Sequence, residues 1–418
     1  MQTVRVPQLA WYHPRDLVLE LPDDWPVEMC YMAGYNRPEL KPEDILSALT
    51  RPVSGPPLRE LARGKKQVTI VFDDLTRATR VSKIVRPVLA ELAAAGIPDD
   101  NISLICALGM HGVFYRQDFV KKLGEDVVSR YRVFNHNAFG NCVYAGATQT
   151  FQNKVYINEE YMKSDLKIVI GSCVPHGVAG FGGGGKIVMP GLASFETVNR
   201  HHQMGHSRMD PALSAAKPAR GMGIIAGNLF KQDLEEAAGL AGIDFFINVL
   251  LNLWGESVSI YAGEWRQAFA GAQKEALTHY RTPKSPDNAV VIANSYAKAN
   301  ESMICLSAGI PLVNRQGGDL VIIANAPDGQ VTHYLVGIFG KNTYACQYAQ
   351  CAIPEYVKRV IIYSEYPHPG SNWFEKDPKI LYLTRWQDVL ACLQQSHGPG
   401  TRTAVIPDAT NQYFAWYD

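Results

Sequence analysis

Short runs of Val, Ile and Leu that each end in polar residues or glycine limit the possible folds most. Such runs lie at QVTIVFDD (67–74), NISLICALG (101–109) and DLKIVIGSC (165–173), and the helix-like segment SKIVRPVLAELAAAG separates the first two. Apolar strands that alternate with helices are typical of a parallel sheet covered on both faces. The chain is therefore predicted to be an α/β protein.

The same alternation resumes after RTPKSPDN (281–288), a segment with the composition of a linker. Four further apolar runs follow it: AVVIAN (289–294), DLVIIANA (319–326), RVIIYSE (359–365) and TAVIPDA (403–409). We expect two α/β domains with largely parallel sheets, residues 1–280 and residues 289–418, and an active site in the cleft between them.

Composition excludes several classes of partner. The 418 residues carry 40 basic and 40 acidic side chains, so nothing argues for a nucleic-acid or membrane surface. No apolar run reaches the roughly 18 residues of a membrane-spanning helix. The eight cysteines show no zinc-site pattern, and reduced thiols in a cytoplasmic protein are the interpretation that they favour.

Polar side chains that can do chemistry follow three of the predicted strands. Asp74, Thr76 and Arg77 come after the first strand, His111 after the second and His176 after the third. The carboxyl ends of parallel strands meet at one edge of a sheet, where open α/β folds bind ligands. We therefore expect these side chains to converge on one site.

A glycine loop follows His176 and ends in Lys186, with His201 and His202 further along. Glycines let the backbone approach a ligand closely, a lysine can meet a phosphate or act as a nucleophile, and histidines bind metals or move protons. Together they indicate a cofactor site. The glycines that we expect at the cofactor are Gly182, Gly183, Gly184 and Gly185.

Two other interpretations of this loop remain open. Gly180, Gly185 and Lys186 satisfy the spacing G-x4-G-K of a phosphate loop, but Ile187 stands where Ser or Thr would hold Mg²⁺. Pro190 would also interrupt the helix that such a loop requires. The glycines could instead serve only to turn the chain.

The ordered motifs of the chain resemble one family, the nickel-pincer-nucleotide-dependent lactate racemases and their homologues. The resemblance covers roughly residues 20–205 and rests on DDLTRATR (73–80), ALGMHG (107–112), VFNHN near residue 135, and PHGVAGFGGGGKIVMPGLASFETVNRHH (175–202). In that family a modified nicotinate mononucleotide holds nickel and is joined to a lysine through a thioamide. The resemblance implies that Lys186 is this lysine and that His202, sixteen residues later, binds nickel, with the adjacent His201 as the alternative.

The resemblance also implies catalytic roles. His111 and His176 match the two histidines that act as alternating bases, and the family's D-x-T-R element matches Asp74, Thr76 and Arg77, with Thr76 at the cofactor. In the C-terminal half the alignment is looser. There, Lys298 in NSYAKANES (294–302) would supply the substrate-binding cation, with Asn300 or Glu301 nearby.

The implied function is a racemase or epimerase of a 2-hydroxy acid. Removing the hydrogen on C2 as a proton is difficult beside an ionised carboxylate, whereas removing it as a hydride leaves a planar keto acid. The cofactor supplies the hydride acceptor, and near-neutral histidines suit the hydroxyl proton. The implied partners are a small 2-hydroxy acid and the proteins that make the cofactor. The alternatives are a nucleotide- or phosphate-binding transferase or hydrolase, and a ligand-binding homologue without catalysis.

Overall fold

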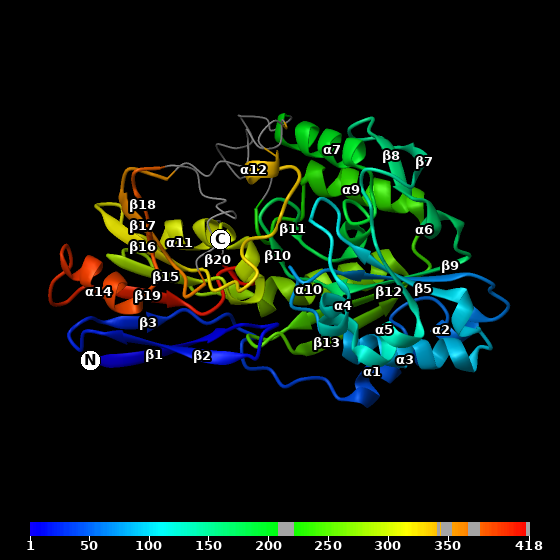
Figure 1. Ribbon diagram of the computed structural model, residues 1–418, viewed down its shortest axis with the longest axis horizontal. Coiled ribbons are helices and arrows are strands. Elements are labelled where there is room, and N and C mark those ends of the chain that lie inside the picture. Colours follow the sequence, from blue (N-terminus) through cyan, green and yellow to red (C-terminus); the bar gives the residue numbers. More distant parts are fainter. Residues whose placement is uncertain (208–220, 341–342, 344–352, 367–376, 415–418) are drawn as a thin grey trace.

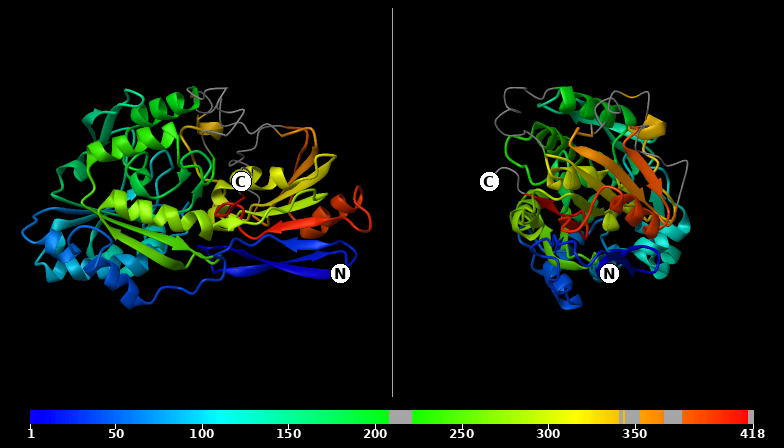
Figure 2. Two further views of the ribbon diagram at one scale, coloured as in Figure 1. Left: turned by 180° about the vertical axis from the view of Figure 1, so that it is seen from behind. Right: turned by 90° about the vertical axis from the view of Figure 1, so that its left-hand side faces the viewer.

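Two six-stranded sheets organise the chain, as the ribbon views in Figures 1 and 2 show. The computed structural model describes residues 1–207, 221–340, 343, 353–366 and 377–414. Both sheets are largely parallel, and helices alternate with their strands. The predicted α/β class is therefore confirmed.

The first sheet has the strand order β13-β12-β9-β4-β5-β6, and every neighbouring pair is parallel except β12 with β13. Three of its strands coincide with the three apolar runs expected in this half. Its strands are β4 (Val68–Asp73), β5 (Ile102–Ala107), β6 (Arg132–Asn135), β9 (Leu166–Ser172), β12 (Phe245–Leu251) and β13 (Ser257–Gly263). All residues of β4 and β12 are buried, which agrees with a sheet covered on both faces.

Helices flank this sheet, with α1 and α3 on one side and α7 and α9 on the other in Figure 1. The helix expected to end at Gly96 is α3, which ends at Ala94 and is followed by Gly96 at a φ of +85°. The helices of this half are α1 (Pro42–Thr50), α2 (Leu58–Ala62), α3 (Val81–Ala94), α4 (Arg116–Leu123), α5 (Glu125–Arg130), α6 (Glu159–Lys163), α7 (Phe195–Ser207), α9 (Leu229–Ala241) and α10 (Trp265–His279).

The second sheet has the strand order β18-β17-β16-β15-β19-β3 and is parallel throughout. Its strands are β3 (Val27–Met29), β15 (Val290–Asn294), β16 (Gly318–Ile323), β17 (Val357–Tyr363), β18 (Ile380–Leu383) and β19 (Thr403–Ile406). Helices α11 (Ile304–Gly309) and α14 (Trp386–Gln394) pack beside it, and the short helix α12 (Gly337–Gly340) follows β16 in the chain. Four of these strands match the apolar runs after the linker.

The first 29 residues lie with the second sheet, although the sequence analysis placed them in the N-terminal domain. Strand β3 pairs with β19, and the hairpin of β1 (Gln2–Gln8) and β2 (Arg15–Leu21) packs its apolar face on the same sheet. In Figure 1 this hairpin runs beneath the second sheet. The apolar residues of the hairpin need a partner face, and the second sheet supplies it.

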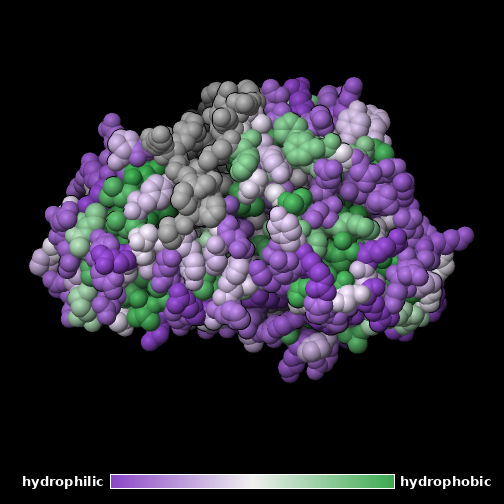
Figure 3. All heavy atoms as spheres, viewed as in Figure 1, coloured by the Kyte–Doolittle hydropathy of each residue, from purple (hydrophilic) through white to green (hydrophobic). Residues whose placement is uncertain are grey.

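Short elements complete the described chain. They are the antiparallel pair β7 (Cys142–Ala147) and β8 (Lys154–Asn158), the pair β10 (Pro175–His176) and β11 (Gly180–Phe181), the pair β14 (Arg281–Thr282) and β20 (Tyr413–Phe414), and the 3-10 turns at Asp99–Asn101, Gly184–Ile187, Tyr296–Glu301 and Ile310–Leu312. Within the described residues, no helix is both long and apolar enough to pass through a bilayer. On the face drawn in Figure 3, hydrophilic residues cover most of the surface, and apolar residues lie between them in small groups.

Candidate active site

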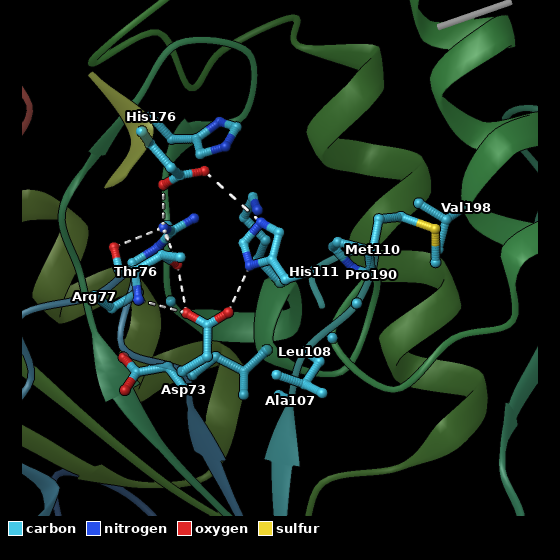
Figure 4. Close-up of a pocket in the computed structure, with 18 of the residues that line it drawn as sticks. Asp73, Thr76, Arg77, Ala107, Leu108, Met110, His111, His176, Pro190 and Val198 are labelled. Carbon is cyan, nitrogen blue, oxygen red and sulfur yellow. Dashed lines mark hydrogen bonds and ion pairs between the residues drawn. The ribbon is translucent and has the colours of Figure 1, made fainter. Parts of the chain in front are cut away.

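The carboxyl ends of both sheets supply the residues of one cavity of about 140 Å³. Segments after β4, β5 and β9 contribute Asp74, His111 and His176, as the sequence analysis expected. Two further residues come from the second sheet, because Glu301 follows β15 and His333 follows β16. Figure 4 shows His111 and His176 among the side chains that line the cavity.

Asp74 and His111 form a carboxylate–imidazole pair at the centre of the cavity wall. The Oδ2 atom of Asp74 lies 2.5 Å from Nδ1 of His111, and its Oδ1 accepts hydrogen bonds from the backbone N–H and the hydroxyl of Thr76 (Figure 4). Burial alone would raise the pKa of Asp74, but the charge of His111 and these hydrogen bonds hold that pKa well below its usual range. The ionised carboxylate therefore receives the Nδ1 proton of His111, which leaves Nε2 as the acceptor of the neutral ring.

Arg77 is held by an acidic residue that comes from the other half of the chain. Its guanidinium donates to Oε2 of Glu301 at 2.7 Å and to the carbonyl oxygen and hydroxyl of Thr76 at 2.9 and 2.8 Å. The other carboxylate oxygen of Glu301 lies 3.7 Å from Nε2 of His111. Glu301 thus touches both a cation and the proton-accepting imidazole of the cavity.

His176 presents the opposite chemical group from His111. Its Nδ1 accepts hydrogen bonds from the backbone N–H groups of Val178 and Ala179, at 3.2 and 3.1 Å. A ring nitrogen that accepts two N–H groups carries no proton, so the neutral ring carries its proton on Nε2. Burial, followed by the nearby positive charge of Lys186, lowers the pKa of His176 well below its usual value. In this arrangement His176 is a neutral hydrogen-bond donor.

Lys186 lines the same cavity, and its amine donates no hydrogen bond to any described residue. Burial and then the charge of Arg77 lower the pKa of Lys186 to about 8, because both disfavour a second cation there. A lysine with such a pKa is partly neutral near pH 7, and the neutral amine is the nucleophilic form.

The four glycines before Lys186 divide into two pairs. Gly182 and Gly183 line the cavity. A Cβ at Gly184 would lie 2.5 Å from the ring of Phe269 in α10, and one at Gly185 would lie 2.8 Å from Ala238 in α9. The second pair therefore packs against protein, and its cofactor contact stays a prediction. The loop continues into a 3-10 turn of four residues, so it is not followed by the long helix of a phosphate loop.

His202 lies at the cavity, whereas His201 faces the protein interior. Nδ1 of His202 donates to the carbonyl oxygen of Val198 at 2.9 Å, so Nε2 carries the lone pair of the neutral ring. This is the arrangement in which metal-binding histidines are commonly held. His201 is fully buried and donates from Nε2 to the carbonyl oxygen of Phe230 at 3.0 Å. Among the described residues, no cluster of three His, Cys, Asp or Glu side chains could hold a metal, so a metal at His202 would need ligands beyond these residues.

Lys298 does not line this cavity. Its ammonium donates to the carbonyl oxygens of Thr410 at 3.0 Å and Pro175 at 3.4 Å, and burial lowers its pKa. It ties the strand that carries His176 to the C-terminal end of the chain. The substrate contact of Lys298 stays a prediction, while Thr76, Arg77, Lys186 and His202 all line the cavity.

A buried lysine that the sequence analysis did not single out supports the loop of Asp74. The Nζ atom of Lys122 donates to the carbonyl oxygens of Asp74 and Arg77 at 2.8 and 2.9 Å and lies 2.7 Å from the carboxylate of Asp73. Lys122 is only 1% exposed, so it acts through these contacts rather than by touching a ligand. A lysine in the amphipathic helix α4 gives no sequence signal for this role.

A second, larger cavity lies next to the first. It measures about 640 Å³. His111 and His333 line the first cavity, and their chain neighbours Gly112 and Thr332 line the second. Aromatic side chains line much of it, including Trp11, Tyr12, Phe114, Tyr115, Tyr296 and Tyr334. Its described lining residues include no histidine, in contrast to those of the first cavity.

Comparison with known proteins finds similarity to lactate racemases. Residues 12–212 match the lactate racemase N-terminal domain family. The lactate racemase of Lactiplantibacillus plantarum is 26% identical over 302 residues, which span 71% of this chain and 69% of that protein. The lactate racemase of Thermoanaerobacterium thermosaccharolyticum is 26% identical over 336 residues, which span 79% of this chain and 76% of that protein.

Solved structures show the same fold. The lactate racemase apoprotein from Thermoanaerobacterium thermosaccharolyticum superimposes with a TM-score of 0.73 at 21% identity and covers 99% of this chain and 100% of that chain. A protein from Thermotoga maritima superimposes with a TM-score of 0.65 at 19% identity and covers 91% of this chain and 100% of its own.

Proposed function

Because this chain belongs to the lactate racemase family and is an isomerase, we propose that it inverts C2 of a 2-hydroxy acid by reversible hydride transfer, with a nickel-pincer nucleotide held on Lys186. One observation carries the proposal: a half-buried, partly neutral lysine shares a cavity with an Asp–His pair and with a second histidine suited to bind a metal. Lactate is the substrate named for the relatives, and the substrate of this chain is a 2-hydroxy acid of the same class.

The residues present fit such a cofactor. The amine of Lys186 would form the thioamide link, because a neutral amine is needed to attack an acyl carbon. Nε2 of His202 would bind nickel, and a single imidazole is enough where the cofactor supplies the other ligands. Gly182, Gly183 and Thr76 would contact the nucleotide. When bound, the cofactor supplies an acceptor that takes a hydride and returns it.

The protein's own residues handle the substrate. Nε2 of His111 takes the hydroxyl proton, and Asp74 fixes the ring in the tautomer that can do so. Arg77 orients the substrate carboxylate with those N–H groups that Glu301 and Thr76 leave unused. His176 carries its proton on Nε2 and donates that N–H, whereas His111 accepts at Nε2. His176 can return a proton to the substrate only if its Nδ1 gives up the two backbone hydrogen bonds and becomes protonated.

The experiment uses protein made together with the cofactor-producing enzymes, which we propose as partners. A panel of 2-hydroxy acids that includes lactate and bulkier acids is incubated with it, and chiral chromatography follows both enantiomers. Lys186→Ala should carry no covalent adduct in intact-protein mass spectrometry, whereas the exposed control Lys66→Ala should carry it. An adduct on the Lys186 variant, or tight binding of ATP with Mg²⁺ in place of an adduct, would overturn the proposal in favour of a nucleotide-binding enzyme.

A further inference from the structure

A fourth histidine in the cavity has no role in the chemistry derived so far. His333 follows β16 and lines the cavity together with His111, Glu301 and Lys186. No motif surrounds His333 in the sequence, and it was not among the residues expected at the site. In the structure its backbone forms an antiparallel bridge with His111, and the bridge places the two rings side by side.

The position of His333 relative to His111 is fixed from both sides of the bridge. The backbone N–H of Gly112 donates to the carbonyl oxygen of Thr332, and that of Tyr334 donates to the carbonyl oxygen of Met110, each at 2.9 Å. The imidazole centroids of the two histidines lie 5.1 Å apart, with 64° between the ring planes. Their nitrogens can therefore meet one small group held between them.

The hydrogen bonding of the ring decides which group His333 offers. Its Nδ1 accepts the backbone N–H of Leu335 at 3.1 Å, so the neutral ring carries its proton on Nε2, at the opposite edge. Burial, followed by the charge of His111, lowers the pKa of His333 to about 3. The ring is therefore neutral at ordinary pH, and it is a donor where His111 is an acceptor.

We propose that His333 is a further catalytic residue, which donates its Nε2–H to the substrate hydroxyl oxygen whose proton goes to His111. The O–H bond breaks and its proton moves to Nε2 of His111. The electron pair left on oxygen forms the C=O bond, while the C2–H pair leaves as the hydride that the cofactor of the proposed function would accept. Negative charge grows on that oxygen as the proton departs, and a fixed neutral donor stabilises it.

This role differs from the one assigned to His176. His333 comes from the second sheet and is bridged to the base itself, so the donor and the acceptor keep one geometry toward the same oxygen. Because the ring of His333 does not titrate near neutral pH, the contribution of His333 to kcat should not depend on pH between about 5 and 9. The inference rests on the proposed function, since it names a donor for that reaction.

Two variants separate donation from packing. His333→Phe keeps the ring volume but removes the N–H, and we expect the kcat of the loaded enzyme to fall by about 10²–10³, the usual effect of losing one such donor. His333→Gln places an amide N–H near the position of Nε2 and should retain kcat within about tenfold of wild type. His397→Phe is the matched control, because His397 bonds to Asp319 away from the cavity, and it should turn over normally.

A measurement without turnover provides a second test. In protein with ¹⁵N-labelled histidine, Nδ1 of His333 should show the shift of an unprotonated nitrogen and Nε2 that of a protonated one from pH 5 to 8. Pyruvate, as the keto-acid probe, should shift the Nε2 proton, and calorimetry should show about 2–10-fold weaker pyruvate binding for His333→Phe, as expected for one neutral hydrogen bond.

The outcomes for the two proposals can be told apart. If wild-type enzyme racemises a 2-hydroxy acid and His333→Phe matches it in kcat and in pyruvate binding, His333 is only a packing residue and this inference is overturned. An equal loss in the Phe and Gln variants, with an unmoved Nε2 proton, would lead to the same conclusion. If the loaded wild-type enzyme racemises no 2-hydroxy acid, the proposed function itself fails, and the role of His333 fails with it.

Discussion

Replacing Asp74 by asparagine should remove the base of the site without changing its shape. Oδ1 of Asp74 accepts two hydrogen bonds from Thr76, one from the backbone N–H at 2.9 Å and one from the hydroxyl. The amide oxygen of the new side chain must take this position, so its NH₂ group faces Nδ1 of His111. Because that group donates, His111 must accept at Nδ1 and keep its proton on Nε2, where it cannot take a proton from the substrate.

The magnitude follows from losing a general base. Such a loss typically slows a reaction by about 10²–10⁴, and the corresponding Asp-to-Asn change in the Ser-His-Asp triad of serine proteases lowers kcat by about 10⁴ through the wrong tautomer. We expect kcat of the loaded Asp74→Asn enzyme to fall within this range for both enantiomers, measured by chiral chromatography. The ¹⁵N spectrum of His111 should show the proton on Nε2 instead of Nδ1.

Two controls make the test of Asp74 sharp. Asp165→Asn makes the same chemical change in a loop far from the cavity and should keep the wild-type rate. In a His111→Gln background, Asp74→Asn should lower kcat by less than about threefold, because the effects of residues that act as one unit are not additive. The coupling of Asp74 to His111 would be refuted by either of two results. The first is a kcat of the single Asp74→Asn variant within about threefold of wild type, and the second is a double variant whose loss in kcat is the product of the two single losses.

Three further predictions concern the cofactor residues and the second histidine of the reaction. His202→Ala should lose nickel on metal analysis more severely than His201→Ala, which should mainly lower the melting temperature, and the reverse order would move the ligand to His201. In protein without cofactor, acylation of Lys186 should reach half its maximum near pH 8, because burial and Arg77 favour the neutral amine. Mass spectrometry of the labelled peptide checks this, and a midpoint near the usual value of about 10.4 would contradict it. In single-turnover experiments, His111→Gln should slow hydride transfer from both enantiomers more than His176→Gln, whereas opposite enantiomer preferences in the two variants would support two equivalent bases.

Much of the fold and part of the site could be predicted from local sequence. The apolar runs at 67–74, 101–109 and 165–173 became neighbouring parallel strands, because buried strands need continuous apolar residues. Their polar ends then had to meet at one edge, which brought Asp74, His111 and His176 together. The family resemblance likewise led us to expect Lys186 and His202 at one site, and both line the same cavity.

Other features depend on contacts between distant segments and leave little local signal. Strand β3 pairs with β19 near the other end of the chain, so no local pattern showed that residues 1–29 belong to the second sheet. Glu301 and His333 enter the site only because the second sheet directs its carboxyl edge to the same cavity. Lys298, expected at the substrate, donates to the backbone carbonyl oxygens of Pro175 and Thr410, and these contacts too join segments that are far apart in the sequence.

The sequence by itself determined the parallel α/β architecture and the residue types of the site, because strand burial and motif spacing are local properties. Tertiary structure decided what each histidine can do. His111 faces a carboxylate and becomes an acceptor, whereas His176 and His333 face backbone N–H groups and become donors. An imidazole has two nearly equivalent nitrogens, and only the group placed against one of them selects the proton position on the other.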